Sequence, residues 1–163
     1  MHRVLKNINY GIITVSTSRY KNLIENKSFT DESGKFLKDE FNAKVHLLVP
    51  DNEEMIIGAI KFIVEEYEDI DCIILTGGTG LAKKDITVEA LKRLVEKEIE
   101  GFKILFCMLS FEDVGTRAML SRAFAGIYKD KVIFSLPGSV NACKLGAKLI
   151  KKEIGHILGH VRE

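Results

Sequence analysis

The chain has 163 residues, of which 46% are apolar, and its 24 Lys and Arg nearly balance its 23 Asp and Glu. This length predicts a single domain over residues 1–163, with enough apolar side chains to bury a core without disulfides. The charge balance excludes the strongly basic surface typical of nucleic-acid binders. No apolar run approaches the ~20 residues of a membrane span, and the N-terminus lacks the apolar region of a signal peptide.

The three cysteines, Cys72, Cys107 and Cys143, are widely spaced and lie within apolar runs. None belongs to a C-x-x-C pair, which argues against a zinc ribbon or a dithiol redox motif. We therefore expect unpaired thiols in a reducing compartment, and a cytoplasmic protein.

Short apolar runs alternate with amphipathic stretches along the chain. The runs typical of strands covered on both faces are 10–15, 45–49, 72–75, 104–108 and 132–134. Apolar residues at helical spacing predict helices around 36–41, 56–67, 88–95 and 140–157. This alternation predicts an α/β fold of three layers, α/β/α, with a mostly parallel central sheet.

Ligands of open α/β sheets bind beyond the carboxyl ends of the strands. Three loops at predicted strand ends have suitable chemistry, namely 49–52, 76–80 and 136–139. Ser139 is predicted to begin the last helix, whose free N–H groups would favour an anion. Glycines in these loops would let the backbone approach a phosphate closely.

The loop TGGTG, residues 76–80, does not match the standard nucleotide motifs. A P-loop starting at Gly77 would need glycine where Ala82 stands, and a dinucleotide fingerprint starting at Gly78 would need it at Lys83. A turn that merely needs positive φ angles is the simpler alternative. Three glycines and two threonines at a strand's carboxyl end nevertheless favour ligand contact.

Asp85 has two candidate roles that the residue pattern leaves balanced. It could cap the helix that follows. Thr87 is an equally good cap, however, and would leave Asp85 free to bind a divalent cation beside a phosphate.

Three segments in this order carry a family resemblance: TGGTGLAKKDITVEAL from Thr76, EGFKILFCMLSFEDVGTRAMLSRAFAG from Glu100, and SLPGSVNACKLG from Ser135. They resemble the molybdopterin adenylyltransferases of molybdenum-cofactor biosynthesis, the MogA/MoaB family, which includes the gephyrin G domain. The similarity extends from Gly11 to about Ile150, and the middle segment is most similar to the MoaB branch. It implies a MogA/MoaB-like fold and transfer of AMP from Mg-ATP to molybdopterin, with release of pyrophosphate.

The resemblance also implies a set of site residues. Asp51 and Asp85 would be the catalytic carboxylates and would position Mg²⁺. The substrate- and nucleotide-binding residues would be Ser16, Thr76, Gly77, Gly78, Thr79, Gly80, Ser110, Ser121, Arg122, Pro137, Gly138 and Ser139. Lys83, Lys84 and Arg122 could offset phosphate charge, although lysines beside a turn are more often solvated.

The partners that the resemblance implies are molybdopterin and ATP as substrates, Mg²⁺ as cofactor, and further copies of the chain in a homotrimer or hexamer. A downstream metal-insertion protein would be a further partner, with no nucleic acid or membrane involved. The chain departs from the family pattern at Val88, which replaces a proline at small cost. It departs again at Lys103 and Cys107, which bear on substrate detail or subunit contacts.

Two alternatives remain open. A non-catalytic molybdopterin-binding or scaffolding member would keep the fold without turnover, although binding alone would not require both Asp51 and Asp85. An unrelated nucleotide-binding α/β enzyme fits the fold alone, and the failed motifs count against it.

His156 and His160 have a spacing that can bind a metal, but no third ligand is near them in sequence. The residues do not decide between molybdenum and tungsten.

Overall fold

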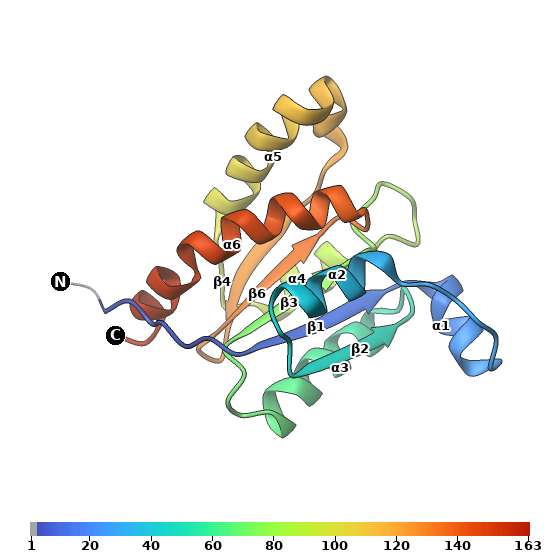
Figure 1. Ribbon diagram of the computed structural model, residues 1–163, viewed down its shortest axis with the longest axis horizontal. Coiled ribbons are helices and arrows are strands. Elements are labelled where there is room, and N and C mark those ends of the chain that lie inside the picture. The colour runs from blue at the N-terminus through green and yellow to red at the C-terminus, as the bar shows by residue number, and fades with distance from the viewer. Residues whose placement is uncertain (1–2) are drawn as a thin grey trace.

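A mixed sheet of six strands forms the centre of the computed structural model, which describes residues 3–163 (Figure 1). Residues 1–2 of the expected domain lie outside the described part. The strands follow the order β2-β1-β3-β6-β5-β4. They are β1 (Tyr10–Val15), β2 (Val45–Val49), β3 (Cys72–Thr76), β4 (Lys97–Glu98), β5 (Phe124–Tyr128) and β6 (Lys131–Leu136). Because β2, β1, β3 and β6 are parallel, their carboxyl ends meet at one edge of the sheet.

Helices cover both faces of this sheet, which confirms the predicted three-layer α/β/α fold. The helical elements are α1 (Thr17–Ile24), α2 (Glu32–Glu40), α3 (Glu53–Glu66), α4 (Thr87–Leu94), α5 (Glu100–Val114), the 3₁₀ helix η1 (Gly115–Leu120) and α6 (Val140–Val161). One buried cluster joins the sheet to α2, α6 and the base of α5, and a second joins it to α3 and α4. None of the helices in residues 3–163 is long and apolar enough to cross a membrane.

The parallel strands supply both clusters because successive side chains of a strand point to opposite faces. Ile12 of β1 and Ile74 of β3 belong to the first cluster, whereas Ile13 and Ile73 belong to the second. All four side chains have no exposed surface. This burial on both faces explains why the runs read as continuously apolar rather than alternating.

The strand predicted at 104–108 is wrong, because these residues lie within α5. Phe102 and Phe106, four residues apart, are buried, while Ile104 and Met108 are 56% and 61% exposed. A short apolar run does not by itself distinguish a strand from a helix with an exposed apolar face. The antiparallel strands β4 and β5 and the helix α1 were not predicted. The predicted helices at 36–41, 56–67, 88–95 and 140–157 correspond to α2, α3, α4 and α6.

Candidate functional site

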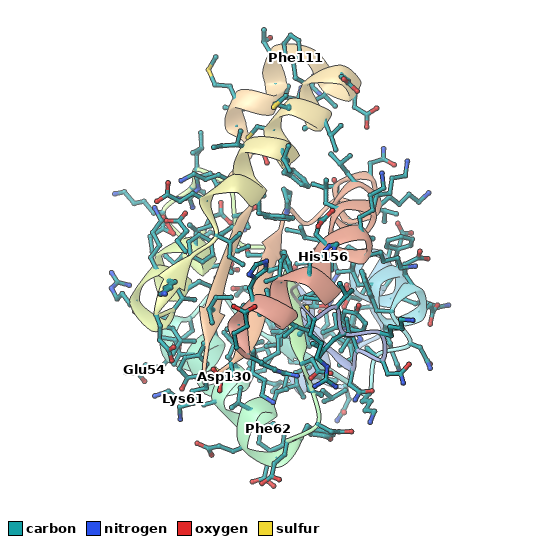
Figure 2. All side chains as sticks on the ribbon, turned by 90° about the vertical axis from the view of Figure 1, so that its left-hand side faces the viewer. Glu54, Lys61, Phe62, Phe111, Asp130 and His156 are labelled. Carbon is teal, nitrogen blue, oxygen red and sulfur yellow. The ribbon has the colours of Figure 1, made fainter. Side chains whose placement is uncertain are left out.

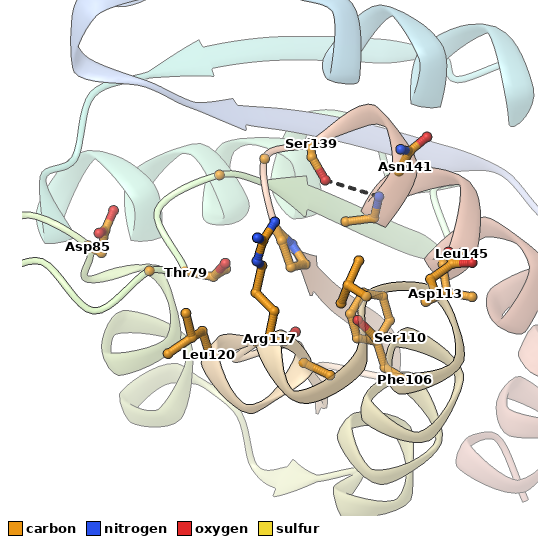
Figure 3. A pocket seen from close by; sticks show the side chains of 18 of the residues that line it. Thr79, Asp85, Phe106, Ser110, Asp113, Arg117, Leu120, Ser139, Asn141 and Leu145 are labelled. Carbon is orange, nitrogen blue, oxygen red and sulfur yellow. Dashed lines mark hydrogen bonds between the residues drawn. The ribbon is translucent and has the colours of Figure 1, made fainter.

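A cavity of about 470 Å³ lies beyond the carboxyl ends of β3 and β6. The loop after β3, the loop before α6, and the arm formed by α5 and η1 contribute its walls (Figure 3). Most residues expected at the site line this cavity: Gly77, Gly78, Thr79, Gly80, Asp85, Ser110, Ser121, Pro137, Gly138 and Ser139. Ser16, Asp51, Thr76 and Arg122 are outside this lining.

The loop Thr76–Gly80, called here the glycine loop, owes its shape to two residues with positive φ. Gly77 has φ +101° and Gly78 has φ +69°, in the region that favours glycine. A Cβ at Gly77 would lie 2.3 Å from the carbonyl oxygen of Val15, and one at Gly78 would lie 2.2 Å from Thr87 Oγ1. The loop therefore needs glycine for both its backbone conformation and its close packing.

Thr76 and Ser16 have structural partners. The buried Thr76 hydroxyl donates a hydrogen bond of 3.2 Å to the carbonyl oxygen of Pro137, which ties the glycine loop to the loop before α6. Ser16 is the N-cap of α1, and its Oγ accepts a hydrogen bond of 3.3 Å from Arg19 N–H. These contacts give both residues a role in positioning the loops around the site.

Asp51 lies against the glycine loop from the side of α1. Its Oδ2 accepts hydrogen bonds from Thr17, at 2.7 Å from the hydroxyl and 3.3 Å from the backbone N–H. A Cβ at Gly78 would lie 3.1 Å from Asp51 Oδ1. One carboxylate oxygen is thus held in place while the other faces the loop.

Asp85 approaches the same loop at Gly80. Its Oδ2 accepts a hydrogen bond of 3.1 Å from Ala82 N–H, and a Cβ at Gly80 would lie only 2.6 Å from that oxygen. The carboxylate therefore stabilises its own loop and lines the cavity.

The expected helix cap at Thr87 is wrong. The N-cap position of α4 is Ile86, and no side chain among residues 3–163 caps this helix by a hydrogen bond. Thr87 is fully buried and uses its hydroxyl to donate to the carbonyl oxygen of Gly77 at 3.0 Å, while its N–H donates to Gly78 at 3.1 Å. Asp85 does not cap α4 either, so both capping alternatives fail.

Arg122 lies behind the glycine loop. Its Nε donates to the carbonyl oxygen of Thr79 at 2.9 Å, and its Nη2 donates to those of Gly80 at 2.8 Å and Asp85 at 3.3 Å. The sequence predicted that Arg122 could offset phosphate charge directly. Its contacts instead favour a role in holding the loop.

The loop before α6 ends in a helix N-terminus that faces the cavity. Ser139 is the N-cap, as predicted, and its Oγ accepts a hydrogen bond of 3.1 Å from Ala142 N–H (Figure 3). Ser121 also lines the cavity, and its buried Oγ has no hydrogen-bond partner within residues 3–163. An orphaned hydroxyl beside a cavity is suited to bind a ligand oxygen.

Arg117 is the main site residue that the sequence did not single out. It is the only basic residue among the described residues that line the cavity, and its side chain extends from η1 toward the loop that carries Ser139 (Figure 3). Lys83 and Lys84, which the sequence offered as cations, are exposed and outside the lining. Arg117 lies in the segment that carried the family resemblance, but a single arginine there gave no signal of its own.

The cavity also has an apolar wall. Phe106, Val114 and Leu120 contribute to it from α5 and η1, and Leu145 contributes from α6 (Figure 3). The site thus combines N–H donors that can bind an anion, two carboxylates at the glycine loop and an apolar wall. This combination suits a phosphorylated heterocyclic ligand.

Cys143 lies below the two loops and supplies no nucleophile. Its Sγ is 3.3 Å from Thr76 Oγ1, and burial raises the pKa of the thiol to about 11. A protonated, buried thiol is inert, so group transfer at this site would depend on positioning and charge.

Comparisons with known proteins agree with this geometry. The family described as "Probable molybdopterin binding domain" matches residues 11–156. The chain is 60% identical over 163 residues to a "Probable molybdopterin adenylyltransferase" of Methanocaldococcus jannaschii, covering 100% of this chain and 99% of that one. It is 43% identical over 162 residues to "Molybdenum cofactor biosynthesis protein B" of Staphylococcus aureus, covering 94% and 91% of the two chains. The solved structure of the tungsten cofactor synthesizing protein MoaB from Pyrococcus furiosus is similar with a TM-score of 0.85, at 36% identity, over 98% of this chain and 99% of that one.

Proposed function

Because the chain belongs to the family of probable molybdopterin binding domains, we propose that it is a molybdopterin adenylyltransferase of molybdenum-cofactor biosynthesis. The observation that carries this proposal is the placement of Asp51 and Asp85 against the glycine loop, at Gly78 and Gly80. The name of the Methanocaldococcus jannaschii relative supports the same reaction.

In the proposed reaction, an oxygen of the terminal phosphate of molybdopterin attacks the α-phosphorus of ATP. A new P–O bond forms, the bond to pyrophosphate breaks, and the pterin carries AMP. Such a transfer needs aligned reactants and neutralised charge more than a protein nucleophile. The N–H groups of the glycine loop and of the α6 N-terminus would hold phosphates, and Arg117 would offset their charge.

The carboxylates also fit a magnesium ion as the cofactor. Within residues 3–163 no group of three or more His, Cys, Asp or Glu side chains could form a metal cage. Mg²⁺ typically binds one or two carboxylates and completes its shell with phosphate oxygens and water. Asp51 and Asp85 would hold it, and when bound it would neutralise charge on the phosphates.

The proposal extends to a homotrimer or hexamer. The arm of α5 and η1 projects from the body of the molecule (Figures 1 and 2). It exposes apolar side chains at Ile104, Leu105, Met108 and Phe111, each at least half exposed. A continuous apolar ridge of this kind is typical of a subunit contact.

The same proposal implies a downstream partner and a cellular compartment. The product would pass to a downstream metal-insertion protein. The unpaired cysteines suit the reducing cytoplasm.

Incubation of the pure protein with molybdopterin, ATP and Mg²⁺ tests the proposed function. We expect adenylylated molybdopterin and pyrophosphate in equal amounts, identified by mass spectrometry. Binding of molybdopterin without either product would instead support the non-catalytic binding or scaffolding role.

A further inference from the structure

Arg122 connects the glycine loop to helix α4 through a second set of contacts. Its Nη1 lies 2.5 Å from Glu89 Oε1, and its Nη2 lies 3.4 Å from Glu89 Oε2. The guanidinium therefore faces a carboxylate on α4 and three backbone carbonyls of residues 79–85 at the same time. A planar group with five N–H donors in a fixed fork is suited to this arrangement.

The three carbonyls belong to the same loop segment, residues 79–85, as the Asp85 carboxylate. Two of them precede it, at Thr79 and Gly80, and the third belongs to Asp85 itself. Gly80 packs so tightly on Asp85 that a Cβ there would lie 2.6 Å from Oδ2. The position of the loop backbone therefore determines where the carboxylate can lie.

Helix α4 also holds the first half of the glycine loop. Thr87, the first residue of α4, binds the carbonyl oxygens of Gly77 and Gly78. The first turn of one helix thus anchors both halves of the loop, directly through Thr87 and indirectly through Glu89 and Arg122. The hydrogen bond from Arg122 holds the pKa of Glu89 below its usual value, so this anchor is charged at neutral pH.

We propose that Arg122 is a positioning residue for AMP transfer: anchored by Glu89, it fixes the loop that aims the Asp85 carboxylate. This role rests on the proposed function, because the position of Asp85 affects turnover only if transfer occurs at this site. It differs from direct charge neutralisation of a phosphate, in which any cation of similar length would serve.

Arg122→Lys and Arg122→Ala separate the two roles. A lysine keeps the charge but has no planar fork, so both variants should lose turnover alike, on the order of 10-fold to 100-fold in kcat. The KM for molybdopterin should rise by a smaller factor than kcat falls, because the loop amides that hold phosphates are loosened rather than removed. Arg93→Lys is the matched control, since Arg93 lies on α4, the helix that carries Glu89, and forms an exposed pair with Glu53 at 2.7 Å.

Hydrogen exchange of the free protein supplies a readout that does not depend on turnover. In both Arg122 variants, amides of residues 77–86 should exchange on the order of 10-fold faster, while those of β3 should be unchanged. Glu89→Gln, which leaves the carbonyl contacts of Arg122 in place, should give a smaller increase. This variant also keeps the test decisive if Arg122→Ala does not fold.

Near-normal kcat in Arg122→Lys with a large loss of kcat in Arg122→Ala would overturn the inference. The charge of residue 122 would then act directly on a phosphate of the substrate. Unchanged hydrogen exchange of residues 77–86 in the Arg122 variants would show that Arg122 does not hold the loop. Unchanged exchange in Glu89→Gln would show that Glu89 does not anchor Arg122. If the wild type transfers no AMP, the proposed function fails, and the positioning role in transfer fails with it. The exchange data would then still show whether Arg122 holds the loop.

Discussion

The hydroxyl of Thr87, at the first residue of α4, donates a hydrogen bond of 3.0 Å to the carbonyl oxygen of Gly77 in the glycine loop. The loop is thus fixed by a residue ten positions further along the chain, on the helix that follows it. A flexible sequence at the end of β3 becomes a defined backbone shape because α4 and Arg122 hold its carbonyls. Such preorganisation is what a phosphate-transfer site requires.

Thr87→Val should destabilise the protein. It removes the donor to Gly77 at almost constant volume, and a buried carbonyl without its donor costs about 1–3 kcal/mol in the free energy of unfolding. Thr87→Ser keeps the hydroxyl and is the matched control, and it should lose less of the free energy of unfolding. Urea unfolding of both variants is the measurement, and equal losses would show that the methyl group, not the hydrogen bond, is what matters.

Asp31 should make stability depend on acid pH. Burial raises the pKa of Asp31, but hydrogen bonds from His46, Thr14 and the Gly34 N–H outweigh this effect, so the net pKa is below its usual value. A carboxyl with a lowered pKa in the folded state contributes stability above its unfolded pKa of about 4, and this is lost as the pH falls through the folded value.

Asp31→Asn isolates that charge, because asparagine still caps α2. The variant should be less stable than the wild type by about 1–2 kcal/mol at pH 7. The difference should shrink as the pH falls below about 4. Unfolding free energies measured between pH 7 and pH 3 provide the test, and a constant difference would mean that the charge is irrelevant.

The three thiols should react unequally with iodoacetamide. Cys72 and Cys143 are buried, and burial raises the pKa of Cys143 to about 11 and that of Cys72 well above its usual value. At pH 8 the native protein should therefore be modified only at the half-buried Cys107, whereas the denatured protein should be modified at all three. Mass spectrometry of the peptides decides, and rapid labelling of native Cys143 would contradict this structure of the loop region.

Phe111→Glu should dissociate the proposed oligomer. Phe111 is 58% exposed near the tip of the arm, and burying a carboxylate in an apolar contact is unfavourable (Figure 2). Phe62→Glu introduces the same charge at a phenylalanine 46% exposed on α3, at the opposite end of the molecule (Figure 2), and should leave the assembly intact. Sedimentation velocity compares the two, and a wild type that is already monomeric would reject the assembly.

The central layers of the fold could be predicted because their signal is local. Strands such as Cys72–Thr76 are buried on both faces, and the helices beside them carry apolar stripes. The strand prediction at 104–108 failed for a physical reason. This stretch is helical and leaves an apolar face exposed on the arm. The two-residue strand Lys97–Glu98 has almost no pattern of its own and exists because β5 pairs with it.

The site was predicted at the level of loops rather than contacts. Glycines at a strand's carboxyl end indicated a phosphate loop, and Ser139 indicated a helix N-terminus. The partners of Thr87 and Arg122 are ten and about forty residues away, so their roles depend on tertiary structure. Arg117 reaches the cavity because η1 follows α5 on the arm that forms one wall of it (Figure 3).

The most direct test of the proposed function compares Asp85→Asn with the wild type in AMP transfer and in molybdopterin binding. Asparagine keeps the size of the side chain and its bond from Ala82 but removes the charge that would serve Mg²⁺. Transfer should fall by a factor on the order of 10² or more. The dissociation constant for molybdopterin and the melting temperature should stay close to those of the wild type. Asp39→Asn, on the exposed face of α2, is the matched control and should transfer AMP normally. Full transfer by Asp85→Asn would contradict the assignment of this carboxylate and with it the catalytic role of the glycine loop.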